Sequence, residues 1–373
     1  MRRPSPSAAI STWRSRWGGI APLLLAEFIV WLGFGGLLPV LSIYFTEQGI
    51  DFATLGVVIA AWPAARLVGE PIFGWLADRT ARVPLMVAGL VLAGVFTVLP
   101  LVITGAVAFI LLRAAVGLAT SIYDPAARGY LTDATPPERR GEAFGLYGAA
   151  QMGGLLIGPA IGAIGAGRLG GIAFVFVFAG VAAALAAVPI ARLKPEGGPR
   201  TRLARDFDTT EIPLDSPTTS RRAANAVIAE QASAAAPSPG RLLNRGLVAA
   251  LVINVGANFA AGTYDVIWSP WLTSLGGSPG LVGLTFSMFS IPVLVLGPIV
   301  GRFVDRRGTF AFIVVGSCMV GVASFMYTLV HDPIFAVGII VIESTGFAII
   351  WPALYAIVAD RTPSSCSARS SRL

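Results

Sequence analysis

Long apolar segments separated by short polar connections make up most of this chain. A helix needs about 20 mainly apolar residues to cross a bilayer. Ten segments meet that requirement, and the pattern therefore predicts an all-α integral membrane protein with ten transmembrane helices. We expect the spans at 20–45, 53–76, 83–103, 106–130, 143–165, 171–191, 247–273, 281–303, 310–330 and 334–358.

The second and eighth segments are copies of each other. Residues 56–79 read GVVIAAWPAARLVGEPIFGWLADR, and residues 283–306 read GLTFSMFSIPVLVLGPIVGRFVDR. They align without a gap at an offset of 227 residues, which places Gly74 on Gly301. Self-similarity of this length indicates two homologous halves, and membrane transporters are often built from such repeats.

Residues 192–245 interrupt the apolar pattern. They are rich in Arg, Pro, Ser, Thr and Ala and cannot bury enough apolar surface to fold alone, so we expect a disordered cytoplasmic linker. The expected organisation is a cytoplasmic tail at 1–19, a six-helix bundle at 20–191, the linker at 192–245, a four-helix bundle at 246–363 and a polar tail at 364–373. Both halves begin on the same side, which makes the repeats parallel.

The second half stops earlier than the first. The offset holds as far as Pro136 and Pro363, after which the first half continues into two more spans and the second gives SSCSARSSRL. We interpret the chain as a truncated or frame-shifted product of a twelve-span parent, with an incomplete second repeat. The alternative is a natural ten-span protein.

Charge placement orients the spans. The chain is 55% hydrophobic and 13% charged with a mean hydropathy of +0.75, against roughly 25% charged residues in soluble domains. The net charge of +7 comes from arginines in alternate connections, which is the positive-inside pattern and not a nucleic-acid face. We therefore expect a multi-pass protein of the plasma (cytoplasmic) membrane with both termini cytoplasmic.

The sequence lacks the residues that several classes of function require. One His and two Cys exclude a His/Cys metal cluster and a disulfide framework. The chain has no nucleophile motif and no phosphate loop, so an enzyme is not expected. We expect no cofactor and no metal.

Four motifs resemble those of one transporter family. Residues 74–82, GWLADRTAR, look like the cytoplasmic signature between spans two and three of the major facilitator superfamily, and residues 301–308, GRFVDRRG, are its second-half echo. Residues 113–117, RAAVG, resemble the family's span-four arginine motif. Residues 154–162, GLLIGPAIG, resemble the span-five motif of antiporters, especially drug/proton exporters. Thr80-Ala81 and Ala163 depart from the family pattern.

This resemblance implies the major facilitator fold and secondary active transport by alternating access. The function it favours is proton-coupled efflux of a small molecule by a monomer in the lipid bilayer, with that substrate and protons as partners. One alternative is a symporter or facilitator for a sugar or another metabolite. Another is a transport-inactive truncated remnant or a membrane interaction protein.

Seven polar residues within the expected spans are candidates for a proton and substrate cavity. A charge in hydrocarbon costs about 2.5 kcal/mol or more, so it should be paired and face a polar cavity. The resemblance implies that Glu27 exchanges a proton while Arg113 stabilises its ionised form, and a static ion pair is the alternative. The other candidates are Asp124, Asn254, Asn258, Asp265 and Glu343. Asp124 could instead cap the end of span four, and the two asparagines could instead join helices by hydrogen bonds.

The repeated signature suggests a conformational latch. A carboxylate at a helix end can accept hydrogen bonds from the first amides of a neighbouring helix. The resemblance implies that Asp78 docks on span eleven and that Asp305 docks on span five. Span eleven is one of the two spans that the incomplete second repeat is expected to lack. Ordinary charged helix ends are the alternative. The latch residues are Gly74, Asp78, Arg79, Arg82, Gly301, Asp305 and Arg306.

Small residues recur about every four positions along span five, at Gly154, Gly158 and Gly162, with Pro159 beside them. This spacing lets helices approach closely, and the proline allows a bend. The resemblance implies an antiporter-like helix, and close packing alone is the alternative.

Overall fold

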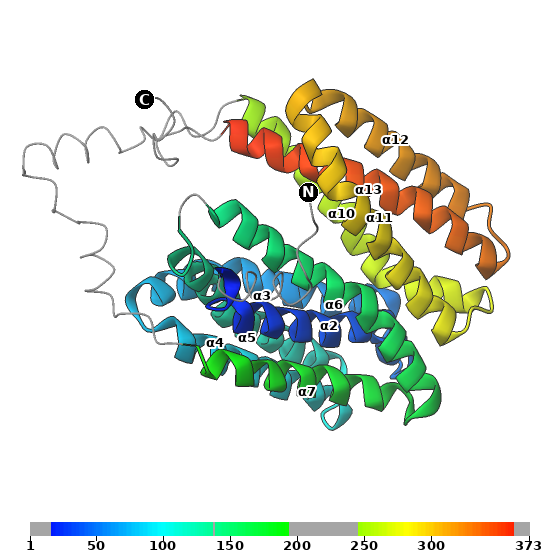
Figure 1. Cartoon of the computed structure of the whole chain (residues 1–373). Coiled ribbons are helices and arrows are strands. Elements are labelled where there is room, and N and C mark those ends of the chain that lie inside the picture. Colours follow the sequence, from blue (N-terminus) through cyan, green and yellow to red (C-terminus); the bar gives the residue numbers. More distant parts are fainter. Residues whose placement is uncertain (1–15, 137–138, 194–244, 362–373) are drawn as a thin grey trace, which may run out of the picture.

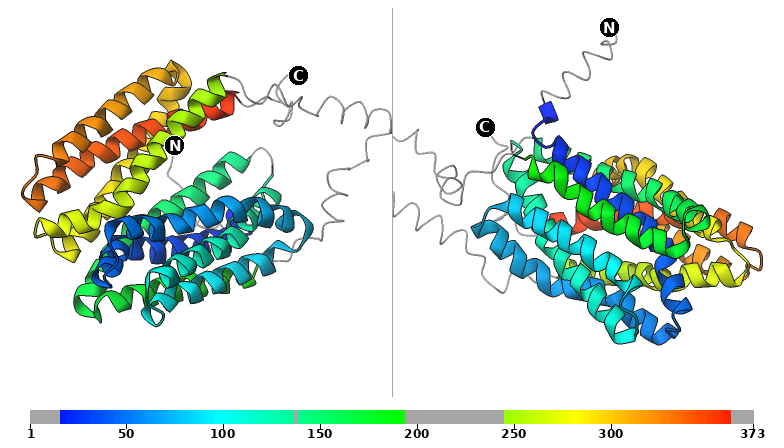
Figure 2. Two further views of the ribbon diagram at one scale, coloured as in Figure 1. Left: turned by 180° about the vertical axis from the view of Figure 1, so that it is seen from behind. Right: turned by 90° about the horizontal axis from the view of Figure 1, so that it is seen from below.

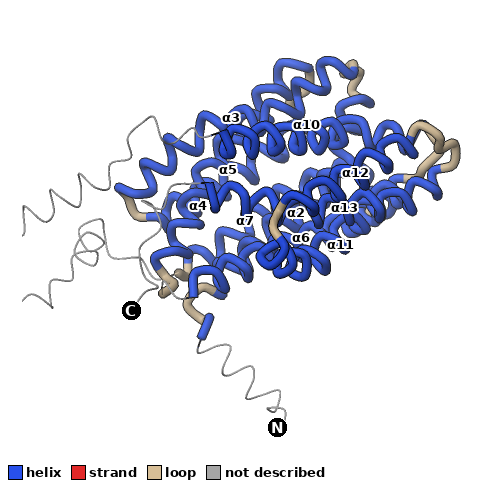
Figure 3. The backbone as a smooth tube through the Cα atoms, turned by 90° about the horizontal axis from the view of Figure 1, so that it is seen from above, coloured by secondary structure: helices blue, strands red, loops and turns tan. Residues whose placement is uncertain are grey.

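The structure is a computed structural model that describes residues 16–136, 139–193 and 245–361. Within this part the regular structure is helical (Figure 3), as the apolar pattern predicts. The long helices are α2 (Ala21–Glu47), α3 (Phe52–Arg79), α4 (Arg82–Val98), α5 (Ala106–Asp133), α6 (Arg140–Arg168), α7 (Gly171–Ala191), α10 (Arg245–Ser274), α11 (Pro279–Arg307), α12 (Phe310–Tyr327) and α13 (Pro333–Arg361).

These helices follow the expected spans in order. In the described part of the chain, nine are long and apolar enough to cross a membrane, and α10 occupies the position of the expected seventh span. A short 3-10 turn, Leu99–Leu101, extends α4. Helices α3 and α5 run a few residues past their expected ends, to Arg79 and Asp133. Backbone hydrogen bonding continues into the charged turns, whereas the apolar pattern stops at the last apolar residue.

The helices form two bundles, which Figures 1 and 2 show from opposite sides. Helices α2 to α7 form the first bundle, in which α2 packs on α6 and α7 while α5 packs on α3 and α4. Helices α10 to α13 form the second, in which α13 packs on α11 and α12. Helix α6 runs along α11, and this contact joins the bundles. Of the expected domains, most of the linker and the C-terminal tail lie outside the described residues.

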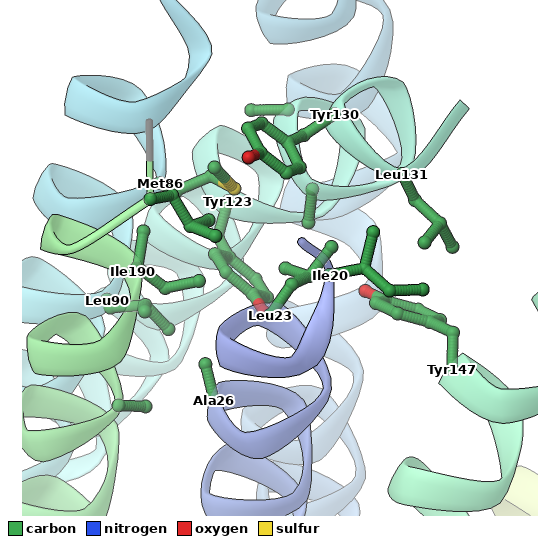
Figure 4. Packing of buried hydrophobic residues seen from close by; sticks show 14 of the residues in the cluster. Ile20, Leu23, Ala26, Met86, Leu90, Tyr123, Tyr130, Leu131, Tyr147 and Ile190 are labelled. Carbon is green, nitrogen blue, oxygen red and sulfur yellow. The ribbon is translucent and has the colours of Figure 1, made fainter. Parts of the chain in front are cut away.

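The first bundle has a buried cluster near the end where α2 begins and α3 ends. We call this the basic end, because Arg79 and Arg82 lie there. Its cluster includes Leu23, Tyr123 and Tyr147, and Figure 4 shows both tyrosine hydroxyls pointing toward α2. Separate clusters fill the opposite end of this bundle and the second bundle.

Glycines allow α6 to lie very close to two other helices. A Cβ at Gly158 would meet the Leu32 carbonyl and the Gly36 amide nitrogen, both on the α2 backbone. On α11, a Cβ at Gly283 would meet the carbonyl oxygen of Pro159 at 2.7 Å. Helix α6 is therefore held between α2 of its own bundle and α11 of the other.

Large apolar side chains cover the outside of the molecule. Leu67, Val102, Phe259 and Phe310 are each between 78% and 80% exposed. Apolar exposure of this extent is what a surface in contact with lipid requires.

Candidate functional site

Glu27 is fully buried in α2 and receives three hydrogen bonds. Trp31 Nε1 donates to Oε1 at 2.9 Å, and Gln151 Nε2 donates to the same oxygen at 2.6 Å. The Tyr123 hydroxyl donates to Oε2 at 2.6 Å. The donors come from α2, α5 and α6, so this one carboxylate ties three helices of the first bundle together. All three are neutral groups that stabilise an ionised carboxylate.

The predicted pairing of Glu27 with Arg113 is wrong. Arg113 lies on α5 ten residues before Tyr123, which corresponds to about 15 Å along the helix axis. The error comes from helix direction. Glu27 follows the start of its span closely at the basic end, whereas Arg113 follows the start of a span that begins at the opposite end.

Arg113 interacts with the second bundle instead. It is 6% exposed, and its guanidinium carbon lies 5.9 Å from the centre of the Trp62 ring. It also interacts electrostatically with Asp265 on α10. Both residues line a cavity of about 610 Å³ between α2, α3, α5 and α10. Two predicted cavity residues, one from each bundle, therefore line the same cavity at the interface.

Three further predicted candidates, Asn258, Asp265 and Glu343, line cavities. Asn258 also lines the 610 Å³ cavity. Asp265 additionally lines a cavity of about 240 Å³ between the second bundle and helices α2 and α6, together with Glu343. Glu343 is 2% exposed and accepts a hydrogen bond from the Tyr327 hydroxyl at 2.8 Å. The side chain of Asn254 lies outside the described part of the structure.

Asp124 joins α5 to α3 and does not cap its own helix. Arg66 on α3 forms ion pairs with both Asp124 and Glu70, the latter with Nε 3.0 Å from Oε1. The Arg66 guanidinium also lies over the Trp62 ring, 4.8 Å from its centre. Asp124 follows Tyr123 directly, so one turn of α5 holds both the Glu27 carboxylate and the Arg66 guanidinium.

Sequence reasoning missed three members of this arrangement. Arg66 and Glu70 are charges four residues apart in the middle of the second span, and the cost of an intramembrane charge is the signal that identifies them. Gln151 is uncharged and carries no comparable signal.

At the basic end, Arg82 links the start of α4 to the end of α5. Its Nη1 lies 2.6 Å from a carboxylate oxygen of Asp133, and its Nη2 lies 3.7 Å from one of Asp78. The Asp78 side chain is 74% exposed. Arg79 lies over the Trp75 ring, 4.1 Å from its centre, and Gly74 faces Pro125. In the second copy, the side chains of Gly301, Asp305 and Arg306 lie outside the described part, so the predicted docking of Asp305 stays a prediction.

The family model described as Major Facilitator Superfamily matches residues 23–371. The quinolone resistance protein NorA of Staphylococcus aureus (strain MRSA252) is 28% identical over 135 residues, which are 36% of this chain and 35% of that protein. The uncharacterized MFS-type transporter MJ1560 of Methanocaldococcus jannaschii is 29% identical over 164 residues, which are 44% and 42% of the two chains. The alignments thus span less than half of each relative.

Solved structures share the fold. The partially occluded inward-open xylose transporter XylE from E. coli aligns with a TM-score of 0.66 at 16% identity, over 92% of this chain and 84% of that one. A peptide transporter POT in complex with sulfate gives 0.65 at 17% identity, over 94% and 83%. At such identities the likeness shows the fold alone. The all-α membrane fold predicted from the sequence is confirmed.

Proposed function

The chain belongs to the Major Facilitator Superfamily, a family of multi-pass membrane transporters and not of enzymes, and from that premise we propose that it exports a small molecule in exchange for protons. The observation that carries this proposal is the cavity of about 610 Å³ between the bundles. Arg113 of the first bundle and Asp265 of the second line it together. A substrate between two bundles can be released on either side of the membrane when the bundles rock.

Glu27 is the proposed proton carrier. The O–H of a buried, protonated carboxyl group needs an acceptor, whereas Trp31, Tyr123 and Gln151 all donate to the ionised form. Protonation therefore changes the bonds to Tyr123 on α5 or Gln151 on α6. Because α6 is the helix that runs along α11, a change at Glu27 reaches the contact between the bundles.

The direction of transport and the orientation in the membrane are also part of this proposal. The relative named as a quinolone resistance protein supports efflux. We assign the basic end to the cytoplasm, which places both termini there in the plasma membrane, and we expect a monomer. In this assignment Gly74, Asp78, Arg79 and Arg82 form the cytoplasmic latch of the first bundle, while Pro159 lets α6 bend between the states.

The test is transport in proteoliposomes under an imposed pH gradient. The purified chain is expected to move substrate against the direction of proton flow, and Glu27→Gln is expected to abolish the dependence on the gradient while leaving membrane insertion intact. Glu47→Gln, a carboxylate exposed at the far end of α2, is the matched control. Unchanged pH dependence in Glu27→Gln would refute the assignment. Substrate that moves in the same direction as the protons indicates a symporter, and the absence of any transport indicates an inactive protein.

A further inference from the structure

Glu343 differs from Glu27 in how its carboxylate is satisfied. Both oxygens of Glu27 accept hydrogen bonds. In Glu343 the Tyr327 hydroxyl donates to Oε2, whereas the buried Oε1 has no hydrogen bond of good geometry. The Tyr264 hydroxyl, which is bonded to Ser324, lies near enough to interact with this carboxylate. A buried carboxylate oxygen without a good hydrogen bond is unfavourable. Glu343 therefore lacks the full set of hydrogen bonds that satisfies Glu27.

Glu343 lines the cavity of about 240 Å³. We call this space the aromatic cavity, because half of the residues that line it are aromatic. Asp265 is its second acidic group, and none of the described residues that line it is Arg or Lys. The aromatic lining consists of Tyr264, Trp268, Phe286, Phe289, Phe347 and Trp351.

Three of these rings, Phe289, Phe347 and Trp351, are in contact in a row. Phe347 lies 5.7 Å from Phe289 and 5.9 Å from Trp351, measured between ring centres. The Trp268 indole N–H is already used, since it donates to the Thr285 hydroxyl at 2.9 Å. The ring faces carry a negative quadrupole, which attracts cations and repels anions.

We propose that the aromatic cavity binds an organic cation, a protonated or quaternary amine with apolar substituents, whose charge lies against Glu343. The two carboxylates supply the counter-charge and the rings supply both cation–π contacts and apolar surface. A bare inorganic cation does not fit this lining, because Ca²⁺ and Mg²⁺ need six or more oxygen ligands. The proposal names the substrate class for the proposed exporter and rests on that function only for its biological meaning.

Asp265 connects the aromatic cavity to the larger cavity between the bundles. It lines both the aromatic cavity and the larger cavity, where it interacts electrostatically with Arg113. A ligand cation and the Arg113 guanidinium therefore compete for one carboxylate. Binding in the aromatic cavity is therefore expected to weaken the electrostatic attraction between Asp265 and Arg113.

The experiment is calorimetric titration of the purified full chain in detergent, without a membrane or a gradient. The probe is benzyltrimethylammonium, and benzenesulfonate is the control with a similar ring and the opposite charge. The cation is expected to bind and the anion is not. Glu343→Gln keeps the size of the side chain and its bond to Tyr327, and it is expected to weaken cation binding about tenfold or more. Glu47→Gln is expected to leave the affinity unchanged.

A second variant guards against loss of folding in the first. Trp351→Leu removes one aromatic face and is expected to weaken cation binding about threefold or more. Equal affinity of the wild type and a folded Glu343→Gln, or equal affinity for cation and anion, would overturn the proposal. If the cation binds as expected but the proteoliposomes show no transport, the proposed binding site is supported and the proposed exporter function is refuted. If transport is proton-coupled but Glu343→Gln binds normally, the site alone fails.

Discussion

Replacing Gly158 by alanine tests whether the close crossing of α6 and α2 is real. The added Cβ would meet the Leu32 carbonyl and the Gly36 amide nitrogen, and these backbone atoms cannot rotate away as a side chain could. Gly148 lies on the same helix with no atom within 4 Å of an added Cβ. The pair Gly158→Ala and Gly148→Ala therefore differs in packing while sharing one chemical change.

The expected sizes follow from two effects. Replacing Gly by Ala inside a helix stabilises it by about 0.5–1 kcal/mol, and this gain applies to both variants. Overpacking a tight contact costs about 1–3 kcal/mol, and this cost applies only at Gly158. Gly148→Ala should therefore be slightly more stable than the wild type, and Gly158→Ala should be less stable than Gly148→Ala by about 1–3 kcal/mol.

The assay is thermal unfolding of the purified variants in one detergent, followed by loss of helical signal. The difference between the variants isolates the packing cost, because the change in helix propensity cancels. A lower unfolding temperature for Gly158→Ala than for Gly148→Ala is expected. Equal temperatures would contradict the close crossing of α6 and α2.

Two further predictions concern charges. Arg66→Met leaves Asp124 without its cation and is expected to lower the free energy of unfolding by about 3 kcal/mol. Adding Asp124→Asn should recover part of this loss. A double variant whose loss of stability equals the sum of the losses in the two single variants would argue against the ion pair. Arg82→Gln is expected to destabilise by about 2 kcal/mol because the side chain is only 8% exposed beside Asp133. The Asp78 side chain is 74% exposed, so Asp78→Asn should change the free energy of unfolding by less than about 0.5 kcal/mol. A larger loss of stability in Asp78→Asn than in Arg82→Gln, measured by unfolding in detergent, would refute the geometry at the basic end.

The helices could be predicted from the sequence because each span is a long apolar segment bounded by charges. The packing partners could not. Gly56 and Gly283 occupy the same position in the two copies, yet a Cβ at Gly283 would meet α6 while one at Gly56 would meet nothing within 4 Å. A repeated motif fixes the local conformation, and the neighbouring helix decides what the motif contacts.

In the candidate site, too, the sequence indicates which residues matter but not which residues they contact. The cost of an intramembrane charge marks Glu27 as a residue that needs partners, and the structure shows it buried with three donors. Its partners Tyr123 and Gln151 are neutral, so an argument built on charge pairs selects Arg113 instead. The electrostatic interaction of Arg113 with Asp265 depends on how two bundles meet, which no local pattern in either span reveals.

Proton movement triggered by substrate tests the central claim most directly. Proteoliposomes that contain the purified chain and an internal pH-sensitive dye are exposed to organic cations such as benzyltrimethylammonium, and the internal pH is followed. Proton-coupled export predicts an immediate pH change with the wild type and none with a correctly inserted Glu27→Gln variant. Identical pH traces for the two proteins, or binding of the cation without any proton movement, would contradict the account.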